Sequence, residues 1–422
     1  MTLTILVSIA FFVALMLLLV AVLLVVKRSV VPSGKVSVDI NDGYRRLEVN
    51  PGETLSAILS QYQIILPSSC GGKGNCGQCR LRVTEGGGAV LPTETSYLTP
   101  GQIADKWRLA CQVKVSGDMK ISIPDTVLSA KMLSCEVAYA RFVSRYYKEI
   151  GIRVPEGEYF NSHAGEYIQI YAPAGTLDFS TFEVPQQFKW DWKDENLFSL
   201  QCVSREETVR AYTLLSYPGE PCPQDPGANI LRILVKIALP PQGWSNPGAC
   251  SSYLFSLREG DKVRLAGPYG EARLPEGLDP EQEYVFIAGG AGMSLARCHI
   301  FNLLKNVKAQ GRITFYYGAR SFADAFYVDD FRALDREFPN FTFRLALDIP
   351  DMAAIMNGVD FDQGYVHQAA YDGYLKQHES PQKAIYFLCG PPEMVKAARA
   401  MLSSLDVPSS NIFGDDFEET GE

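Results

Sequence analysis

Residues 68–80 of this 422-residue chain read SSCGGKGNCGQCR and place three cysteines within ten residues. Cys70, Cys76 and Cys79 follow the spacing C-x5-C-x2-C, and Cys111 lies further on in the segment RLACQVKV. Four thiolates can bind either a tetrahedral zinc ion or a [2Fe-2S] cluster. Structural zinc sites usually pair two C-x2-C knuckles, whereas this chain has one knuckle, one long loop and one solitary cysteine. The spacing therefore favours the iron-sulfur cluster, with zinc as the alternative.

The glycines of this loop support the same interpretation. They stand at positions 71, 72, 74 and 77, where the lack of side chains lets the backbone wrap closely around an inorganic cluster. Backbone N–H groups that point at the cluster sulfurs help to set its potential. We therefore expect the loop to serve as a cradle for the cluster.

The segments on either side of the loop predict a small mixed domain. KVSVDI (35–40) and YRRLEV (44–49) alternate like the strands of a hairpin, and TLSAILSQY (54–62) has helical spacing. QCRLRVTEG (78–86) and CQVKVSG (111–117) also alternate like strands. Residues 33–130 thus resemble the β-grasp [2Fe-2S] ferredoxin family, an α+β fold in which the four cysteines named above would ligate the cluster. The first cysteine gap is one residue longer than in the plant-type pattern.

The composition indicates a folded chain with no nucleic-acid partner. Hydrophobic residues make up 47% and aromatic residues 11%, which is typical of globular domains rather than of disordered chains. The length allows about two to four domains. The formal net charge is −9 and no polybasic tract is present, so binding to nucleic acid is not expected.

The first residues of the chain form an apolar run, Leu3–Val26, in which Thr4 and Ser8 are the only polar side chains. As a helix, this run would be about 36 Å long, against about 30 Å for the hydrocarbon core of a bilayer. A cleaved signal peptide is the alternative, but no basic region precedes the run, and VVKRSVVPSGK (25–35) offers no small-x-small cleavage site. We therefore expect residues 1–30 to be an uncleaved transmembrane helix with a basic flank.

The charges after this run predict the orientation of the chain. Lys27, Arg28 and Lys35 follow it directly, so the positive-inside rule places the remaining residues in the cytoplasm. No later stretch is apolar enough to span a bilayer. Ten cysteines in a reducing compartment are not expected to form a disulfide framework, which again favours thiols that bind metal.

A second candidate site lies in the segment ETVRAYTLLSYP (207–218). Arg210 and Tyr212 share one face of a predicted strand, and Thr213 points to the other face or ends the strand. A flavin needs a cation for its phosphates, an aromatic plane for its ring and a hydroxyl near its reactive nitrogen, and these three residues can supply them. An ordinary half-buried strand shows the same alternation, so this motif alone is not specific.

A turn of small residues further on makes the flavin interpretation stronger. In PGACSSYLFSLREGDKVRLAGPYGE (247–271), Gly248 to Ser252 are expected to open a helix, whose free N–H groups and dipole favour a phosphate. Together the two motifs resemble the ferredoxin-reductase family. That resemblance implies an antiparallel β-barrel FAD domain over residues 131–275. It also implies that Tyr212 stacks on the isoalloxazine ring, that Thr213 lies near N5, and that phosphate contacts come from Arg210, Gly248, Ser251 and Ser252.

The last third of the chain carries three strand-to-glycine turns typical of an α/β nucleotide-binding domain. They are YVFIAGGAGMSLARCHIFNLL (284–304), RITFYYGARS (312–321) and KAIYFLCGPPEMV (383–395). The strict G-x-G-x-x-G fingerprint is absent from the first of them. Ligands of such sheets bind beyond the carboxyl ends of the strands, and we expect the three turns to lie there in register. Each turn alone could be an ordinary strand-to-helix connection.

The GARS and CGPPEM segments also resemble the NAD(P) domain of the ferredoxin-reductase family, here residues 280–422 with a Rossmann-like fold. The resemblance places Cys389 near the nicotinamide and assigns nucleotide contacts to Gly289, Gly290, Gly292, Gly318, Arg320, Gly390 and Pro391. Asp324 and Asp329 follow Gly318 with only Arg320 to offset them, which would repel a 2′-phosphate and favours NADH over NADPH.

The order of these parts along the whole chain resembles the subunit designated F in the sodium-translocating NADH:quinone reductase family. The likeness includes the insertion FEVPQQFKWDWKDENLF (182–198) and the C-terminal segment. It implies a component of a membrane complex in the bacterial inner (cytoplasmic) membrane, with the other subunits as partners and quinone as the indirect electron acceptor. Hydride would pass from NADH to FAD, and single electrons would pass to the [2Fe-2S] cluster.

Two other functions are consistent with some of these motifs. The reductase component of a cytoplasmic oxygenase can carry the same three modules but normally lacks a membrane helix. A tethered one-electron carrier with relic nucleotide domains is a non-enzymatic alternative, against which the intact RAYT, GGAG and CGPPEM segments argue.

The remaining chemically distinctive residues receive mostly structural interpretations. Phe417 in GDDFEE is predicted to cover the flavin face that the nicotinamide must reach, and the alternative is a plug of the domain core. The four histidines show no metal-binding spacing. Five further cysteines show no mutual pattern and are expected to be small buried residues: Cys135, Cys202, Cys222, Cys250 and Cys298.

Overall fold

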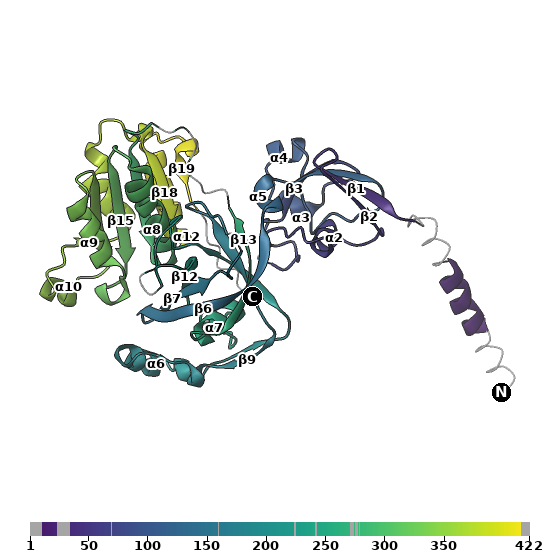
Figure 1. Ribbon diagram of the computed structural model, residues 1–422, viewed down its shortest axis with the longest axis horizontal. Helices are drawn as coiled ribbons and strands as arrows, with labels where there is room; N and C mark the ends of the chain where they lie inside the picture. The colour runs from purple at the N-terminus through teal and green to yellow at the C-terminus, as the bar shows by residue number, and fades with distance from the viewer. Residues whose placement is uncertain are drawn as a thin grey trace. The chain divides into compact units, whose positions relative to one another are not determined.

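The computed structural model describes residues 11–22, 34–68, 70–158, 160–222, 225–240, 243–270, 274, 277 and 279–414. It divides the chain into two compact units, Met1–Ala130 and Lys131–Glu422, which are described separately (Figure 1). Residues 11–22 are helical with exposed side chains, and the remainder of the expected membrane helix lies outside the described residues. In the described part of the chain, no helix is both long enough and apolar enough to cross a bilayer.

The first unit is built on a five-stranded sheet with the order β2-β1-β5-β3-β4. Its strands are β1 (Val36–Ile40), β2 (Arg45–Val49), β3 (Arg80–Glu85), β4 (Trp107–Leu109) and β5 (Met119–Ser122). β1 and β5 run parallel, and the other pairs are antiparallel. Short helices accompany the sheet: α2 (Leu55–Gln61), α3 (Pro92–Thr95), α4 (Pro100–Ala104) and α5 (Asp125–Leu128). This is the predicted α+β arrangement.

Helix α2 forms where its apolar spacing predicts it. The Thr54 side chain caps its N-terminus by accepting a hydrogen bond from the Ala57 N–H. Leu55, Ile58 and Leu59 follow the helical period and are all buried against the sheet, which fixes the helix on one face of the unit.

Residues 111–117, which we predicted as a strand, do not form one. Val113 and Val115 are buried alternately, as the pattern requires. Their backbone bonds nevertheless go to the start of α2 and the loop before it, since the Leu55 N–H donates to the Val113 carbonyl (2.8 Å) and the Val115 N–H donates to the Glu53 carbonyl (3.0 Å). The alternation therefore predicted the buried residues correctly. The strand prediction was wrong, because the hydrogen-bond partners come from the start of α2 and the loop before it and not from a neighbouring strand.

The flavin-type half of the second unit is an antiparallel barrel with the strand order β11-β8-β13-β6-β7-β12. An isolated bridge between Leu214 and Ile233 joins the two edges of this sheet. Ile150, Ile168 and Leu265 are fully buried inside it. The strands are β6 (Lys131–Ser144), β7 (Tyr147–Arg153), β8 (Tyr167–Ala172), β11 (Thr208–Thr213), β12 (Ile230–Lys236) and β13 (Lys262–Tyr269), and helix α7 (Ala249–Ser256) packs on them.

The inserted segment between β8 and β11 forms a small subdomain on this barrel. Trp192 is fully buried, and its indole N–H donates to the Arg145 carbonyl at 2.8 Å. The subdomain therefore packs on the turn between β6 and β7. Its elements are β9 (Gly175–Asp178), η1 (Phe179–Thr181), η2 (Gln186–Phe188), α6 (Lys189–Asp194), η3 (Leu197–Ser199) and β10 (Gln201–Ser204).

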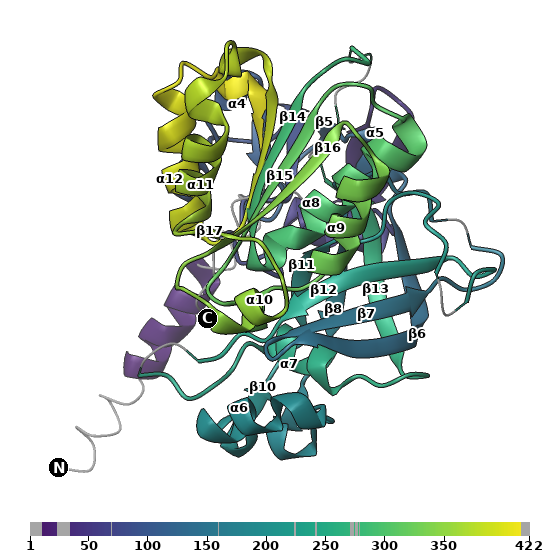
Figure 2. The ribbon, with the colours of Figure 1, turned by 90° about the vertical axis from the view of Figure 1, so that its left-hand side faces the viewer.

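The other half of the second unit is a parallel sheet with the order β17-β16-β15-β14-β18-β19. Its strands are β14 (Tyr284–Gly289), β15 (Ile313–Ala319), β16 (Phe341–Leu347), β17 (Asp362–Gln363), β18 (Ile385–Cys389) and β19 (Ile412–Phe413). Figure 2 shows α8 and α9 on one face of this sheet and α11 and α12 on the other. The helical segments are η4 (Gly290–Gly292), α8 (Met293–Phe301), η5 (Asn302–Val307), η6 (Phe322–Asp324), α9 (Val328–Glu337), α10 (Met352–Met356), α11 (Val366–Gly373), η7 (Leu375–Gln377), η8 (Pro381–Lys383), α12 (Pro392–Ser403) and η9 (Ser409–Asn411).

Candidate functional site

The four predicted cluster ligands lie in two pairs. The Cys70 and Cys76 sulfurs are 3.3 Å apart, and the Cys79 and Cys111 thiols are hydrogen-bonded to each other. Among the described residues, no three side chains of the His, Cys, Asp or Glu type gather as they would around a single metal ion. Two thiols for each of two irons is the donor set of a [2Fe-2S] cluster, whereas one zinc ion would need all four sulfurs around one point. The residues present therefore fit the binuclear cluster.

The thiol pKa values are split within each pair. The hydrogen bond from Cys76 lowers the pKa of Cys70 to about 4, and the bond from Cys79 lowers the pKa of Cys111 to about 7. The same two bonds, together with burial, raise the pKa values of the donors Cys76 and Cys79. One thiolate is thus readily available in each pair, which is the ionised form that a metal requires.

Two glycines of the loop are required by geometry. Gly74 and Gly77 have φ values of +84° and +65°, in the left-handed region. A Cβ atom on Gly74 would lie 2.3 Å from the Gln112 amide nitrogen, and one on Gly77 would lie 2.8 Å from the Tyr97 ring. Gly74 and Gly77 therefore let the loop pack closely on Gln112 and Tyr97, and the wrapping of the loop around a cluster stays a prediction.

A buried ion pair that no sequence motif predicts orders the segments beside the cluster loop. Glu94 is fully buried, and the Arg108 guanidinium donates to its two carboxylate oxygens at 2.9 and 2.7 Å. Arg108 also donates to the carbonyls of Gly87, Gly88 and Ala89. Burial raises the pKa of Glu94, but the hydrogen bonds and charge of Arg108, together with the backbone N–H groups of Leu91 and Leu109, outweigh this effect and hold that pKa below its ordinary value. The only signal in the sequence is Arg108, a charged residue between the apolar residues Trp107 and Leu109.

The structure brings the two flavin motifs together. Arg210 and Tyr212 lie opposite Ile170 and Ile168 on β8, and helix α7 packs against β8 and β11. The Tyr212 phenol is hydrogen-bonded to Cys250, in the first turn of α7. Burial raises the pKa of Tyr212 well above its ordinary value, so the ring is neutral.

The turn before α7 fits a phosphate cradle. Gly248 caps the helix, and a Cβ there would lie 2.8 Å from the Ala238 side chain. The Ser251 hydroxyl accepts a hydrogen bond from the Ala238 N–H and donates to the Gly248 carbonyl. Ser252 is fully buried, and its hydroxyl has no hydrogen-bond partner among the described residues. A buried hydroxyl at a helix N-terminus can accommodate an oxygen of the FAD pyrophosphate.

A second buried polar group lies beside Thr213. Gln169 is fully buried on β8, and neither end of its amide has a partner among the described residues. Thr213 pairs with Tyr167, so Thr213 and Gln169 share one face of the sheet. The sequence did not point to Gln169, because a single amide in an alternating strand gives no signal. Its unpaired donor and acceptor fit the polar edge of a flavin ring.

The three glycine turns of the parallel sheet lie at its carboxyl edge and in register. Gly289 at the end of β14 pairs with Gly318 on β15, and Ala288 pairs with Cys389 on β18. A Cβ on Gly292 would lie 1.9 Å from the Cys389 carbonyl oxygen, so the turn and the CGPP segment pack backbone to backbone. This close approach explains why small residues recur at these strand ends, as expected for a nucleotide site.

The remaining nucleotide-site residues surround this edge. Gly390 lies against Gly289, with 3.1 Å from a Cβ on Gly390 to the Gly289 backbone nitrogen. Pro391 caps α12, whose N-terminus therefore begins at the same edge. Gly290 has a φ of +54°, and a Cβ there would lie 2.5 Å from the Tyr147 hydroxyl. Arg320 is exposed after β15.

The structure bears on the prediction about Asp324 and leaves the prediction about Phe417 untested. Asp324 is not offset by Arg320 alone, because the Arg145 guanidinium from the barrel pairs with it at 2.9 Å. The expected repulsion of a 2′-phosphate therefore loses one of its two carboxylates and rests on Asp329. Phe417 lies outside the described residues.

The other cysteines are buried, as predicted: Cys135, Cys202, Cys222, Cys250 and Cys298. Three of them also make polar contacts, and one of these is the hydrogen bond that the Cys202 thiol donates to the Pro247 carbonyl at 3.5 Å. Cys250 contacts Tyr212, and the Cys298 thiol donates to the Ser216 carbonyl at 3.0 Å.

Comparison with known families matches all three cofactor regions. The family described as "2Fe-2S iron-sulfur cluster binding domain" matches residues 38–116, "Oxidoreductase FAD-binding domain" matches residues 195–274, and "Oxidoreductase NAD-binding domain" matches residues 286–400. These matches agree with the donor sets described above for a cluster, FAD and a nicotinamide nucleotide.

Curated relatives match nearly the full length of the chain, and both named here are the subunit designated F of a "Na(+)-translocating NADH-quinone reductase". The protein of Actinobacillus succinogenes is 40% identical over 409 residues, which is 96% of this chain and 97% of that protein. The protein of Neisseria gonorrhoeae is 39% identical over 415 residues, or 98% of this chain and 99% of that protein. Among solved structures, the cytochrome P450 reductase GcoB of Amycolatopsis has a TM-score of 0.60 at 22% identity, covering 90% of this chain and 98% of that one, which shows a shared fold.

Proposed function

This chain belongs to the Na(+)-translocating NADH-quinone reductase family, as the subunit designated F, and we propose that it is the NADH-oxidising, electron-input component of such a membrane complex. The proposal rests on three features that occur in one chain. They are a four-thiol site whose sulfurs lie in two pairs, an antiparallel barrel that carries the flavin motif, and a parallel sheet whose glycine turns lie in register at one edge. When bound, FAD takes a hydride from NADH and releases electrons one at a time, which suits a [2Fe-2S] cluster.

The chain's own residues prepare the hydride-transfer site. We assign Tyr212 to support the flavin ring, Thr213 to donate or accept a hydrogen bond near N5, and Arg210 to neutralise phosphate charge. Gly248, Ser251 and Ser252 offer the helix N-terminus and a buried hydroxyl to the pyrophosphate.

The edge of the parallel sheet is assigned to NADH. Gly289, Gly290, Gly292 and Gly318 leave room for the dinucleotide against the backbone, and Gly390, Pro391 and Arg320 border the same edge. Cys389 ends strand β18, which lies next to β14, and is assigned a place beside the nicotinamide. Orientation of the two reacting rings is what this part of the chain contributes to the rate.

Electrons are proposed to leave through the first unit. Cys70, Cys76, Cys79 and Cys111 would hold two irons, two thiols to each, because the sulfurs are already paired in that way. Other subunits of the complex are the proposed acceptors, and quinone receives the electrons indirectly.

The direct test uses the purified chain. It should contain FAD, iron and acid-labile sulfide, and NADH should bleach its flavin absorbance in a stopped-flow trace. Failure of NADH to reduce the bound flavin would contradict the proposal. The oxygenase-reductase alternative would instead require the chain to support an oxygenase and not the reduction of quinone by membranes.

Attachment to the membrane is proposed to rest on residues 1–30, whose apolar run supports a single-pass anchor with the cofactor units on the cytoplasmic side. A chain that begins at Ser33 should remain soluble, retain FAD and iron and reduce artificial acceptors, yet fail to restore quinone reduction by membranes. Full restoration by the truncated chain would contradict the anchor.

Phe417 is proposed to cover the flavin face that the nicotinamide must reach. Phe417→Ala should then change the KM values for NADH and NADPH and their ratio while the melting temperature is unchanged. A large fall in melting temperature with unchanged kinetics would identify the residue as a core plug instead.

A further inference from the structure

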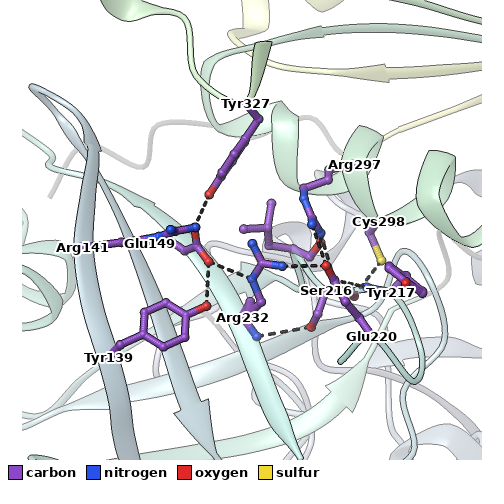
Figure 3. Close-up of polar contacts among 11 residues, drawn as sticks. Tyr139, Arg141, Glu149, Ser216, Tyr217, Glu220, Arg232, Arg297, Cys298 and Tyr327 are labelled. Carbon is purple, nitrogen blue, oxygen red and sulfur yellow. Dashed lines mark hydrogen bonds and ion pairs between the residues drawn. The ribbon is translucent and has the colours of Figure 1, made fainter. Parts of the chain in front are cut away.

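A buried carboxylate links the barrel to the parallel-sheet half of the second unit (Figure 3). Glu149 on β7 is fully buried and accepts hydrogen bonds from four side chains. Tyr139, Arg141 and Arg232 belong to the barrel and donate at 2.7 to 3.1 Å. The fourth donor is Tyr327, which precedes α9 in the other half and whose hydroxyl lies 2.7 Å from the Glu149 Oε2 atom.

A second carboxylate extends this contact along the boundary. Arg232 donates from Nε to Glu149 and from Nη1 to Glu220, the latter at 2.7 Å. Arg297 on α8 donates to both oxygens of Glu220, at 2.9 and 2.6 Å. Glu220, Arg232 and Arg297 are nearly inaccessible to solvent, with side-chain exposures of 8%, 7% and 5%. Two carboxylates and two guanidiniums thus balance in the buried part of the network.

The two ends of this network adjoin the two cofactor motifs. Arg297 lies five positions after Gly292, on the helix that the nucleotide glycine turn opens. The same Arg297 donates to the carbonyl of Leu215 at 3.0 Å, two positions after Thr213. Cys298 and Ser216, which follow Arg297 and Leu215, are also hydrogen-bonded, because the Cys298 thiol donates to the Ser216 carbonyl at 3.0 Å. The segment that follows the flavin strand β11 is therefore hydrogen-bonded directly to the nucleotide helix α8.

Such ties matter because hydride transfer depends steeply on geometry. The reacting atoms must lie about 3–3.5 Å apart, and a misplacement of about 1 Å can cost about a hundredfold in rate. The flavin motif and the nucleotide motif belong to different halves of the unit, so the angle between the halves sets this distance. Buried charge-assisted hydrogen bonds are directional and short, which makes them suited to fixing that angle.

We infer that Tyr327 and Arg297 are positioning residues, which hold the nicotinamide-binding half against the flavin-binding half through Glu149 and Glu220. The inference rests on the proposed function, because it assumes that NADH reduces a flavin bound at the barrel. Neither residue is among those assigned above to FAD or NADH, so neither is assigned a catalytic role. Their effect is on the rate of hydride transfer and not on the affinity for either cofactor.

The chain offers a matched control for this inference. Tyr139 and Tyr327 each donate one phenolic hydrogen bond to Glu149 at 2.7 Å, but Tyr139 does so from within the barrel and Tyr327 from across the boundary. Tyr139→Phe and Tyr327→Phe therefore each remove one phenolic hydrogen bond from the same carboxylate, the first at Oε1 and the second at Oε2. A purely structural role for the network predicts equal effects of the two substitutions.

The test is stopped-flow reduction of the flavin by NADH and by NADH deuterated at the transferred position. Tyr327→Phe should slow flavin reduction at saturating NADH by about tenfold, weaken the NADH–flavin charge-transfer absorbance and change the isotope effect. Tyr139→Phe should leave all three unchanged. Both variants should retain full FAD and the same KM for NADH.

A second position is tested in case the loss of the Tyr327 hydrogen bond alone has too small an effect to measure. Arg297→Lys keeps the charge but cannot bind both oxygens of Glu220, so it should also slow flavin reduction at unchanged FAD content, whereas Arg297→Met should slow it further. Equal rates in Tyr139→Phe, Tyr327→Phe and Arg297→Lys would overturn this inference alone. Absence of flavin reduction by NADH in the unsubstituted chain would overturn the proposed function and, with it, the inference.

Discussion

Each unit of this protein contains a fully buried carboxylate, Glu94 in the first and Glu149 in the second, and their partners differ in range. Glu94 bonds to Arg108, 14 positions away. Glu149 bonds to Tyr327, 178 positions away and in a different half of its unit. The first ion pair is therefore a local device that orders one set of loops, whereas the second fixes one half of a unit against another.

The difference follows from how each region would hold its cofactor. A cluster bound by four thiolates is positioned by its own ligands, so the protein has only to order the loops that carry them. Two bound ring systems that exchange a hydride are held without covalent bonds, so their separation depends on the packing of whole domains. A buried ion pair can order loops and can also hold two domains together. Breaking such a pair leaves an uncompensated buried charge, which costs about 3–5 kcal/mol.

The largest expected effect is the loss of the cluster in Cys76→Ala with flavin reduction retained. Cys76→Ala removes one of four ligands, so the iron-sulfur absorbance should vanish, together with one-electron transfer to acceptors that the cluster serves. Flavin reduction by NADH should continue at its original rate, because the second unit is compact in itself. Stopped-flow spectra at flavin and cluster wavelengths make the comparison. Loss of flavin reduction in a folded Cys76→Ala chain would contradict the order NADH, flavin, cluster.

The next effect concerns stability within the first unit. Glu94→Ala leaves the buried Arg108 charge uncompensated, so the first unit should lose about 3–5 kcal/mol of unfolding free energy. Denaturant unfolding followed by the cluster absorbance would measure it. Glu85→Ala is the matched control, because its pair with Lys120 is exposed and contributes little. Equal losses in both variants would show that the burial of Glu94 is not what matters.

Acid should test the second carboxylate. Burial raises the pKa of Glu149, but Arg232 and Arg141 outweigh it, and the pKa falls to about 2 from the ordinary value of 4.5. A depressed folded-state pKa stabilises the protein above the ordinary value and ceases to do so as pH falls toward about 2. Unfolding of a chain that begins at Lys131 should therefore become easier between pH 4.5 and 2. Glu149→Gln should be less stable at neutral pH and show a shallower dependence in this range, and an unchanged slope would argue against the ion pair.

The sequence allowed most of the elements at the cofactor sites to be predicted, because each is local. The RAYT strand, the GACSS helix start and the GGAG turn are contiguous segments whose propensities agree with the final fold, and the cysteine spacing indicated the binuclear donor set. Residues 111–117 failed as a strand because their backbone partners came from the start of α2 and the loop before it.

The residues of the Glu149 and Glu220 network could not be predicted, because their partners are distant in the sequence. Arg232 is a single charge among apolar neighbours and Glu149 directly follows Lys148, and only the paired register of β7 and β12 brings Glu149 and Arg232 together. Tyr327 and Arg297 reach the same network from another half of the unit. A charge in the middle of a buried strand was the one available signal, and it indicates that a partner exists without saying which residue it is.

The smallest expected effect on flavin reduction comes from the partly exposed ion pair between Arg145 and Asp324. Arg145 also crosses the boundary to pair with Asp324, but the two side chains retain exposures of 25% and 18%, and Arg145 has a second carboxylate, Asp191, at 3.4 Å. Solvent screening and this alternative partner make the contact weak.

Asp324→Asn should therefore slow flavin reduction by less than about twofold, in contrast to Tyr327→Phe. It should also leave the ratio of NADH to NADPH kcat/KM nearly unchanged, because the Asp324 charge is already balanced by Arg145 and repels a 2′-phosphate only weakly. Asp329→Asn, at an exposed position in the first turn of α9, should reduce the preference for NADH more than Asp324→Asn does. Steady-state kinetics with both nucleotides on the two variants would decide the matter. A larger loss of discrimination in Asp324→Asn would mean that Arg145 leaves this carboxylate when a nucleotide binds, and that the exposed pair opens while the buried one stays closed.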